Sequence, residues 1–385
     1  MNTRILPWLE TRWVAPSFSG LVLSGLALFF FLAATNTMAG WLYVISGVLV
    51  SLLTIAALLS RQTLAQIQLS RRPILPISAG ETLTVELLVQ NSTSKRKELL
   101  QVEDLIPSVL GEPVRRVVET LAAHGTHYWV YEQPVAKRGI YRWHSVRVRT
   151  AAPLGLFWCR QEFGVSAIAT VYPTVLPLSR CPLIDELGQD TSLLDDHRRT
   201  QAATEGLTRS LRPYRWGDST RLIHWRTSAR YGELRVRELE TLTSGQEMTI
   251  CLDSTTSWDS EAFEQAVVAA ASLYFYAIHQ TINIRVWTAG SGVIAGNQAV
   301  LETLAAITPA EETQIERLPM TSLIWLTQNP LSLHSLPNGS RWILWNDRPK
   351  QLIPLPGLVI QPEQPTGAGR NQSLQRQLQN DSTSS

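Results

Sequence analysis

The hydrophobic and polar positions near the start of the chain predict a membrane hairpin. No charged side chain occurs between Arg12 and Arg61, and this window holds two apolar runs, 18–34 and 41–59, joined by the uncharged segment TNTMAG. Each run of about 17–19 residues gives roughly 26–28 Å of helix, close to the ~30 Å hydrocarbon core. A cleaved signal peptide would have a shorter apolar region and would leave the second run unexplained. We therefore expect residues 1–62 to span a membrane twice.

The charges that flank these runs predict the orientation. Arg4 and Arg12 precede the first run, and Arg61, Arg71 and Arg72 follow the second, while the turn between them carries neither lysine nor arginine. The positive-inside rule then places both ends in the cytoplasm. The expected location is the inner (cytoplasmic) membrane, with the bulk of the chain facing the cytoplasm.

Residues 63–180 alternate with a period of two. In the segment 81–91, ETLTVELLVQN, apolar Leu83, Val85, Leu87 and Val89 are separated by Thr, Glu and Leu. Such alternation, in short runs bounded by Pro and Gly, is typical of antiparallel strands with one buried face. The pattern predicts an all-β, sandwich-like domain. No catalytic constellation is visible in it.

Residues 247–361 read as alternating strands and helices. The buried strand EMTICLD is followed by a long helical run, EAFEQAVVAAASLYFYAIHQ, and then by INIRVWTAG, QAVLETLAAI, TSLIWLTQ and RWILWN. Alternation of this kind predicts an α/β doubly wound, mostly parallel sheet with helices on both faces. In such folds the binding sites lie at the carboxyl ends of the strands, which is where Asp253 falls.

Asp253 opens the stretch with the clearest metal-binding pattern. Thr255 and Ser257 follow at intervals of two, so three oxygen ligands could meet at one loop. Oxygen ligands of this type suit Mg²⁺. The alternative is a helix cap, with Ser257 or Ser260 capping the helix that follows.

Composition narrows the functional classes. The 385 residues hold 34 Lys and Arg against 32 Asp and Glu, a net charge of +2, so no global field favours nucleic acid as a partner. Cys159, Cys181 and Cys251 are too few and too scattered for a disulfide framework or a zinc site, and free thiols suit a reducing compartment. Residues 362–385 are rich in Gln, Ser, Asn and Gly, which predicts a disordered tail.

The segment LRPYRWGDSTRLIHWRTSAR, residues 211–230, concentrates arginine and tryptophan without lysine. Its arginines could clamp phosphates while the indoles stack on bases, but the near-neutral charge speaks against this. His224 and Asp218 could form an acid–base pair, yet no nucleophile is placed beside them. The favoured interpretation is a structural and interactive segment, in which guanidinium groups pair with carboxylates and stack on indoles. Arg221 and Arg230 are then expected to pair with buried carboxylates.

The same segment carries a family resemblance. It resembles the signature of the bacterial domain-of-unknown-function family fifty-eight: Arg-x-Tyr-x-x-Gly-Asp, Arg-x-Ile-His-Trp, Ser-Ala-Arg and Leu-x-Val. The upstream segments KRGIYRW and AAPLGLFW are similar to further motifs of that family, with Ala152 and Leu154 departing from the second. The signature positions taken as an interaction site are Arg212, Tyr214, Gly217, Asp218, Arg221, His224, Trp225, Ser228 and Arg230.

This resemblance implies a fold and a metal site. It implies a von Willebrand factor A-like domain over residues 247–361, with residues 181–246 as a connecting segment. Asp253, Thr255 and Ser257 then correspond to a metal-ion-dependent adhesion site. Gln328 and Asn329 stand where that site normally gains an aspartate, which implies that Mg²⁺ binding is weak or lost.

The resemblance also implies a role. Relatives occur beside MoxR-type AAA+ ATPases and transglutaminase-like membrane proteins, so the expected function is a membrane-tethered cytoplasmic scaffold or adaptor in the assembly of a partner complex. The expected partners are the membrane, such an ATPase and other membrane proteins. The alternative is a hydrolase-type enzyme that uses the neighbourhood of Asp218 and His224.

Overall fold

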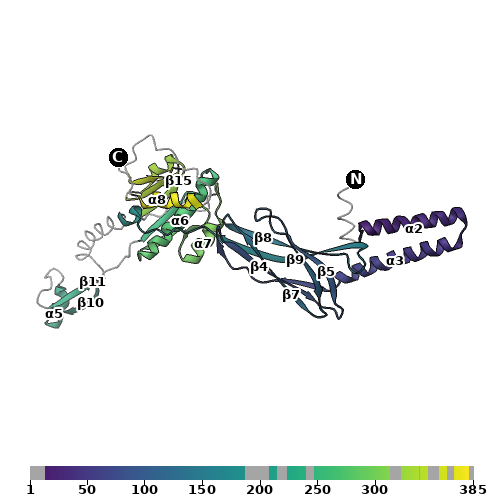
Figure 1. Cartoon of the computed structure of the whole chain (residues 1–385). Coiled ribbons are helices and arrows are strands. Elements are labelled where there is room, and N and C mark those ends of the chain that lie inside the picture. The colour runs from purple at the N-terminus through teal and green to yellow at the C-terminus, as the bar shows by residue number, and fades with distance from the viewer. Residues whose placement is uncertain are drawn as a thin grey trace. The chain divides into compact units, whose positions relative to one another are not determined.

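The computed structural model describes residues 14–186, 208–214, 223–239, 247–312, 322–337, 339–345, 355–361 and 368–380. The chain divides into two compact units, Met1–Tyr172 and Pro173–Ser385. Figure 1 shows the helices and strands of both units. The boundary follows Tyr172, a few residues before the one predicted at 180, because Leu176, Cys181, Leu183 and Ile184 pack into the core of the second unit.

The first unit begins with the predicted helical hairpin. Helices α2 (Phe18–Thr37) and α3 (Gly40–Leu64) are both long and apolar enough to cross a membrane, and 17% of each span is buried. The core helix of a soluble protein would be mostly buried, so this exposure is consistent with membrane association. In Figure 1 the two helices run side by side from the sandwich.

Small side chains bring the two helices together. Gly20, Ala27 and Ala34 are the buried residues of α2, and their spacing of seven places them on one face of the helix. Small residues allow the backbones of apolar helices to approach closely. The hydroxyl of Ser46 in α3 donates a hydrogen bond of 2.9 Å to the carbonyl of Ala27.

The strand-rich region predicted after the hairpin is confirmed, as two sheets that share one core. The larger sheet has the order β1-β9-β8-β5-β6, with β3 added in parallel to β9, and the smaller has the order β2-β4-β7. The strands are β1 (Ala15–Pro16), β2 (Ile67–Arg71), β3 (Ile77–Ser78), β4 (Thr82–Asn91), β5 (Lys97–Asp104), β6 (Val114–Leu121), β7 (Thr126–Pro134), β8 (Gly139–Thr150) and β9 (Phe157–Tyr172).

The alternation read from the sequence fixes the inner face of β4. Leu83, Val85, Leu87 and Val89 are each at most 1% exposed, and they pack with Val102, Val146 and Val148 of the opposite sheet. Because successive side chains of a strand point to opposite faces, a period of two is enough to build this core.

The second unit contains a six-stranded sheet of order β14-β13-β12-β15-β16-β17. All neighbours are parallel except the edge pair β13–β14. The strands are β12 (Glu247–Leu252), β13 (Asn283–Thr288), β14 (Gly292–Ile294), β15 (Ser322–Thr327), β16 (Arg341–Leu344) and β17 (Gly357–Val359). The first strand in the sequence therefore lies in the middle, and the strand order reverses beside it.

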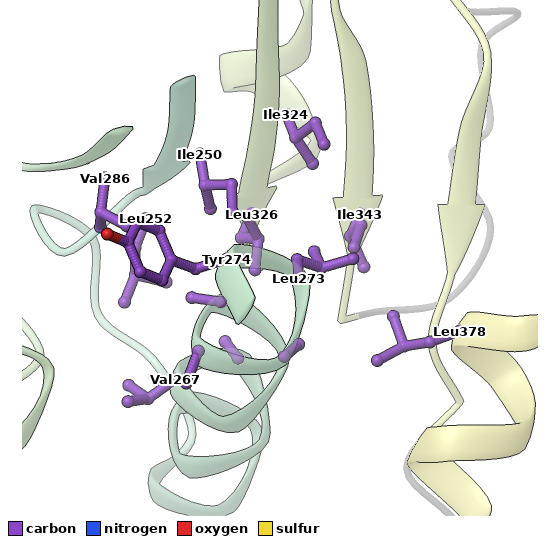
Figure 2. Packing of buried hydrophobic residues seen from close by; sticks show 14 of the residues in the cluster. Ile250, Leu252, Val267, Leu273, Tyr274, Val286, Ile324, Leu326, Ile343 and Leu378 are labelled. Atoms are coloured by element: carbon purple, nitrogen blue, oxygen red, sulfur yellow. The ribbon is translucent and has the colours of Figure 1, made fainter. Parts of the chain in front are cut away.

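One face of this sheet is covered by helices. Ile250, Leu252, Val286, Ile324, Leu326 and Ile343 point toward α6 (Ser260–His279), as Figure 2 shows. Helix α7 (Asn297–Ala306) adds Val300 and Leu304 to the same cluster.

The opposite face carries a tryptophan-rich cluster. It contains Trp287, Trp325 and Trp342, and the 3₁₀ helix η2 (Pro330–Ser335) contributes Leu333. All the described α-helices that reach this sheet pack on its first face. A second helical layer, which a doubly wound sheet implies, stays a prediction, since 313–321 and 346–354 lie outside the described residues.

The prediction of a disordered tail is wrong for residues 368–380. They contain helix α8 (Ala368–Gln379), whose Leu374 and Leu378 are 2% and 0% exposed and pack into the cluster beneath α6. Gln375 also donates a hydrogen bond to the carbonyl of Pro177. Two leucines spaced by four form one apolar stripe on a helix, and this stripe is sufficient to dock an otherwise polar segment.

Candidate functional site

Asp253 lies at the carboxyl end of β12, in the middle of the second unit's sheet. Its side chain is buried, and the residue is 3% exposed. The carboxylate accepts two hydrogen bonds of 2.8 Å, from the hydroxyl of Thr255 to Oδ1 and from the hydroxyl of Thr327 to Oδ2. Thr327 is the last residue of the neighbouring strand β15, so two adjacent strand ends supply this group. We call Asp253, Thr255 and Thr327 the strand-end cluster.

An open pocket of about 670 Å³ adjoins the strand-end cluster. It is lined by Thr256, Ser257, Trp258, Asp259, Gln328, Asn329 and Pro330. Ser257 is exposed on this wall, and the indole Nε1 of Trp258 donates a hydrogen bond of 2.6 Å to the carbonyl of Asp253. Thr256 Oγ1 is buried and has no hydrogen-bond partner within the described structure.

Asp259 caps helix α6, in place of Ser257 or Ser260, which the sequence offered as the alternative to a metal site. Its Oδ2 accepts hydrogen bonds from the backbone N–H groups of Glu261 and Ala262, at 3.1 and 3.2 Å. A carboxylate at this position also interacts favourably with the positive end of the helix dipole. Because Asp259 caps the helix, Ser257 does not act as its N-cap.

Gln328 holds the same helix start from the neighbouring strand. Its side-chain Oε1 accepts a hydrogen bond of 2.8 Å from the backbone N–H of Asp259. A neutral amide therefore stands where the resemblance leads one to look for an aspartate. Sequence reasoning missed Thr327 and Asp259; a hydroxyl or carboxylate at a strand end or just before a helix is the signal that could have identified both.

The oxygen atoms of the strand-end cluster are the type of ligand that a hard cation prefers. The cluster contains a single carboxylate, however, so it carries little negative charge to balance a divalent cation. It offers one carboxylate and hydroxyls, and Mg²⁺ is held in proteins by one or two carboxylates with several waters. Within the residues that the structure describes, no group of three or more His, Cys, Asp or Glu side chains is placed to hold a metal ion. These residues therefore fit a weak Mg²⁺ site in which water completes the coordination.

The family signature folds into a small hairpin with a short helix. Strands β10 (Thr208–Pro213) and β11 (Arg235–Leu239) pair antiparallel, and α5 (Trp225–Tyr231) lies between them in the sequence. The backbone N–H of Tyr214 donates to the carbonyl of Leu234, and Ile223 forms a bridge with Val236. Ile223 and Val236 are 6% and 2% exposed, so they form the apolar centre of this segment.

His224 and Ser228 maintain this local fold. His224 Nδ1 accepts a hydrogen bond of 3.2 Å from the N–H of Thr227 and lies 2.7 Å from the Thr227 hydroxyl, so the imidazole caps α5. The buried hydroxyl of Ser228 donates to the carbonyl of His224 at 3.1 Å and accepts from the N–H of Arg235 at 2.9 Å. Both side chains thus have a structural role.

Tyr214 is half-buried, whereas the side chains along α5 are mostly exposed. Trp225 and Tyr231 are 65% and 59% exposed, and the guanidinium of Arg235 lies 4.4 Å from the centre of the Tyr231 ring. Arg230 is exposed, and the candidate carboxylates Asp218 and Glu240 lie outside the described residues, so its expected pairing with a buried carboxylate stays a prediction. The sequence predicted that arginines of this segment stack on indole rings, and here Arg235 stacks on the phenol ring of Tyr231 instead.

Several signature positions cannot be placed. Gly217, Asp218 and Arg221 lie outside the described residues. Arg212 is described through its backbone, which pairs with Val236, and not through its side chain. The pairing of Asp218 with His224 therefore stays a prediction.

A family comparison covers the segments just described. Residues 210–314, from the signature hairpin through α6 and α7, match the family described as "Protein of unknown function DUF58". This match supports the DUF58 family. The chain is also 28% identical over 230 residues to the "Uncharacterized protein YeaD" of Bacillus subtilis (strain 168), covering 57% of this chain and 54% of that protein. The chain thus matches about half the length of this relative.

Solved structures resemble the chain only faintly. The CARDB domain of a Pyrococcus furiosus protein, crystallised with di-metal ions, is 11% identical, with a TM-score of 0.18, covering 26% of this chain and 91% of that one. A β-glucosidase from Listeria innocua in complex with gluconolactone is 20% identical, with a TM-score of 0.15, covering 26% of this chain and 16% of that one. Scores this low carry no inference about fold or function.

Proposed function

We propose that this protein is a membrane-tethered cytoplasmic adaptor that works with a MoxR-type AAA+ ATPase in the assembly or maturation of a partner complex. Helices α2 and α3 span the inner membrane, with both termini in the cytoplasm. The signature hairpin binds the protein partner. The second unit acts as a von Willebrand factor A-like domain.

The exposed signature surface is the observation that carries this proposal. Trp225 and Tyr231 present large aromatic rings to solvent, with the exposed Arg226 and Arg230 on the same short helix. Aromatic residues and arginine are the types enriched in protein interfaces and among the side chains that dominate binding energy. A catalytic centre would instead gather titratable groups in a cleft. The described part of the signature therefore supports binding.

The sheet of the second unit supports the von Willebrand factor A-like assignment. Its first strand lies in the middle, the order reverses beside it, and the edge strand β14 is antiparallel. Asp253 directly follows that first strand and lies next to Thr327, at the kind of crevice where open α/β sheets bind their ligands. Asp253, Thr255 and Ser257, with Thr327, would hold Mg²⁺, which in turn would attract a carboxylate of a partner.

The hydrolase alternative gains no support from the geometry of His224. Its Nδ1 is engaged by the N–H and the hydroxyl of Thr227. The hydroxyl beside it belongs to Thr227, whose backbone N–H also donates to Nδ1, so this contact is part of the helix cap. The neighbouring hydroxyl of Ser228 is buried and bonded to two backbone groups. The adaptor function is therefore the better supported of the two.

Co-purification tests the adaptor function directly. The full chain in detergent is expected to retain a co-expressed MoxR-type ATPase of the same organism, and Trp225→Ala with Tyr231→Ala is expected to weaken this binding by at least tenfold, because two interface aromatics of the hot-spot type contribute more than about 1 kcal/mol each. Tyr128→Ala is the matched control, since Tyr128 is 61% exposed on the sandwich. Equal retention by the double variant and the control would refute the proposal.

A further inference from the structure

The end of the sandwich that joins the helical hairpin is built as a fixed joint. Ala15 and Pro16 pair with Trp158 and Phe157 of β9, directly before α2 begins. The backbone N–H of Ser17 donates 2.8 Å to the carbonyl of Leu156. A Cβ on Gly20 would collide with that same carbonyl oxygen. The β8–β9 loop therefore lies against the first turn of α2.

A buried lysine makes the corresponding joint at α3. Lys97, 4% exposed, donates hydrogen bonds from Nζ to the carbonyls of Thr63, at 2.8 Å, and of Ala65. These carbonyls lie at the end of α3, where the helix leaves acceptors without partners and its dipole favours a cation. The N–H of Ser92 also donates to the carbonyl of Gln66. The β4–β5 loop is therefore tied to the exit of α3.

These two joints place exposed basic residues beside the helix ends. Lys95 and Arg96 project from the β4–β5 loop, with the Arg96 side chain 73% exposed and paired with Glu98. The exposed Arg61 lies on the last turn of α3. Asn91 holds the loop in shape by donating to the carbonyls of Lys95 and Ala122, at 2.8 and 2.9 Å.

Two exposed leucines accompany the basic residues. Leu99, at the start of β5, is 58% exposed, and Leu154, in the β8–β9 loop, is 47% exposed. The two segments are adjacent, because the Thr150 hydroxyl donates to the carbonyl of Leu99. We call Arg61, Lys95, Arg96, Leu99 and Leu154 the membrane-proximal surface.

The sequence alone had assigned the positive charge after the second apolar run to Arg61, Arg71 and Arg72, and of these Arg61 lies on the membrane-proximal surface. Arg71 is inside the sandwich with a side chain 1% exposed, and Arg72 pairs with Glu86. Lys95 and Arg96, about thirty residues after α3, take their place at the membrane end.

We propose that the membrane-proximal surface binds the headgroups of anionic phospholipids. Basic side chains next to a membrane attract anionic lipids, and each Lys or Arg at this distance shifts the docked-to-free ratio roughly fivefold. Leucines beside them insert at the boundary of headgroups and acyl chains, as in interfacial segments. The surface holds the sandwich against the bilayer, which goes beyond tethering by two helices. The proposal rests on α2 and α3 spanning the membrane.

Reconstitution of the full chain in lipid nanodiscs tests this directly. A spin label on Ser94→Cys reports the mobility of the exposed β4–β5 loop, because the native cysteines in the described structure are buried. The label is expected to be immobilised in discs of phosphatidylcholine with about 30% phosphatidylglycerol, and mobile in phosphatidylcholine alone. High salt is expected to release it, since about 1 M salt shortens the Debye length to roughly 3 Å.

Charge-removing variants separate lipid binding from loop rigidity. Lys95→Gln with Arg96→Gln is expected to lower the docked-to-free ratio roughly 25-fold, the product of two fivefold effects. Lys137→Gln with Arg142→Gln removes two exposed charges at the opposite end of the sandwich and is expected to leave the label immobilised. Equal mobility in the two lipids, or immobilisation that survives Lys95→Gln with Arg96→Gln, would overturn the proposal. Failure to insert into discs would instead refute the membrane spans.

Discussion

The guanidinium of Arg71 and the carboxylate of Asp104 form an ion pair of 2.7 Å inside the β-sandwich, with side chains 1% and 0% exposed. Arg71 ends β2 of the smaller sheet and Asp104 ends β5 of the larger, so the pair joins the two layers. Tyr131 and Trp143 also donate to the Asp104 carboxylate, at 2.7 and 3.0 Å. Burial and the adjacent carboxylate raise the pKa of Tyr131, which keeps its hydroxyl protonated.

The first prediction concerns this buried pair. Asp104→Asn leaves the Arg71 charge without a counter-ion, so the free energy of unfolding of the sandwich is expected to fall by about 3–5 kcal/mol. Glu86→Gln breaks the exposed pair with Arg72 and is expected to cost roughly 0–1 kcal/mol. Thermal melts of the detergent-solubilised chain compare the two variants. Equal melting temperatures would show that the buried pair is dispensable.

The second prediction concerns the acid stability of the sandwich. Burial tends to raise the pKa of Glu103, but hydrogen bonds and charges from Arg115 and Arg147 outweigh it and hold the pKa below its usual range. A depressed carboxyl pKa stabilises the fold above the unfolded pKa, and this contribution is lost as pH falls through the folded pKa. We expect the melting temperature to drop more steeply below pH 4.5 in the parent than in Glu103→Gln. Parallel pH profiles would contradict this assignment.

The sandwich core follows from local patterning, whereas its central ion pair does not. The alternation of Leu83, Val85, Leu87 and Val89 defines a buried face because the strand period is fixed at two. Nothing local relates Arg71 to Asp104, since their contact depends on how two sheets pack. The same limit applies to Lys97, which sequence reasoning left unassigned and which binds the end of α3.

In the α/β unit, too, the features set by local sequence were predictable and those set by the packing of distant segments were not. Asp253 at a strand end was predictable from the strand that precedes it, as was its nearness to Thr255. Its bond to Thr327 was not, because the neighbour of β12 is set by strand order. Helix α8 was missed because a composition rich in Gln and Ser hides two leucines spaced by four.

The third prediction concerns membrane topology. Arginines flank the apolar runs and the connecting turn has none, so a reporter fused after Ser385 is expected to be active in its cytoplasmic form. A reporter placed in the turn at Met38, between α2 and α3, is expected to be active in its periplasmic form. The opposite pair of signals would reverse the orientation and move both soluble units to the other compartment.

The fourth prediction concerns Mg²⁺. If the strand-end cluster binds the cation, a Mg²⁺ concentration tenfold above Kd stabilises the folded state by about 1.4 kcal/mol, which raises the melting temperature by a few degrees. Asp253→Ala is expected to abolish this shift. Asp259→Ala is the control: it removes the cap of α6 and lowers the starting stability, but it is expected to keep the shift. No shift in the parent protein would reject the metal site.

The fifth prediction separates the structural role of His224 from a catalytic one. His224 caps α5 through Nδ1, and loss of a cap costs about 0.5–2 kcal/mol, so His224→Ala is expected to loosen the signature hairpin and weaken binding of the ATPase. Asparagine is a strong helix cap and cannot act as a general base near neutral pH. His224→Asn is therefore expected to restore both the fold and the binding. Hydrogen exchange of the α5 amides and co-purification of the ATPase measure the two effects on the same variants. If His224→Asn folds and binds like the parent yet fails to complement a deletion strain, the imidazole performs chemistry, and the hydrolase becomes the better explanation.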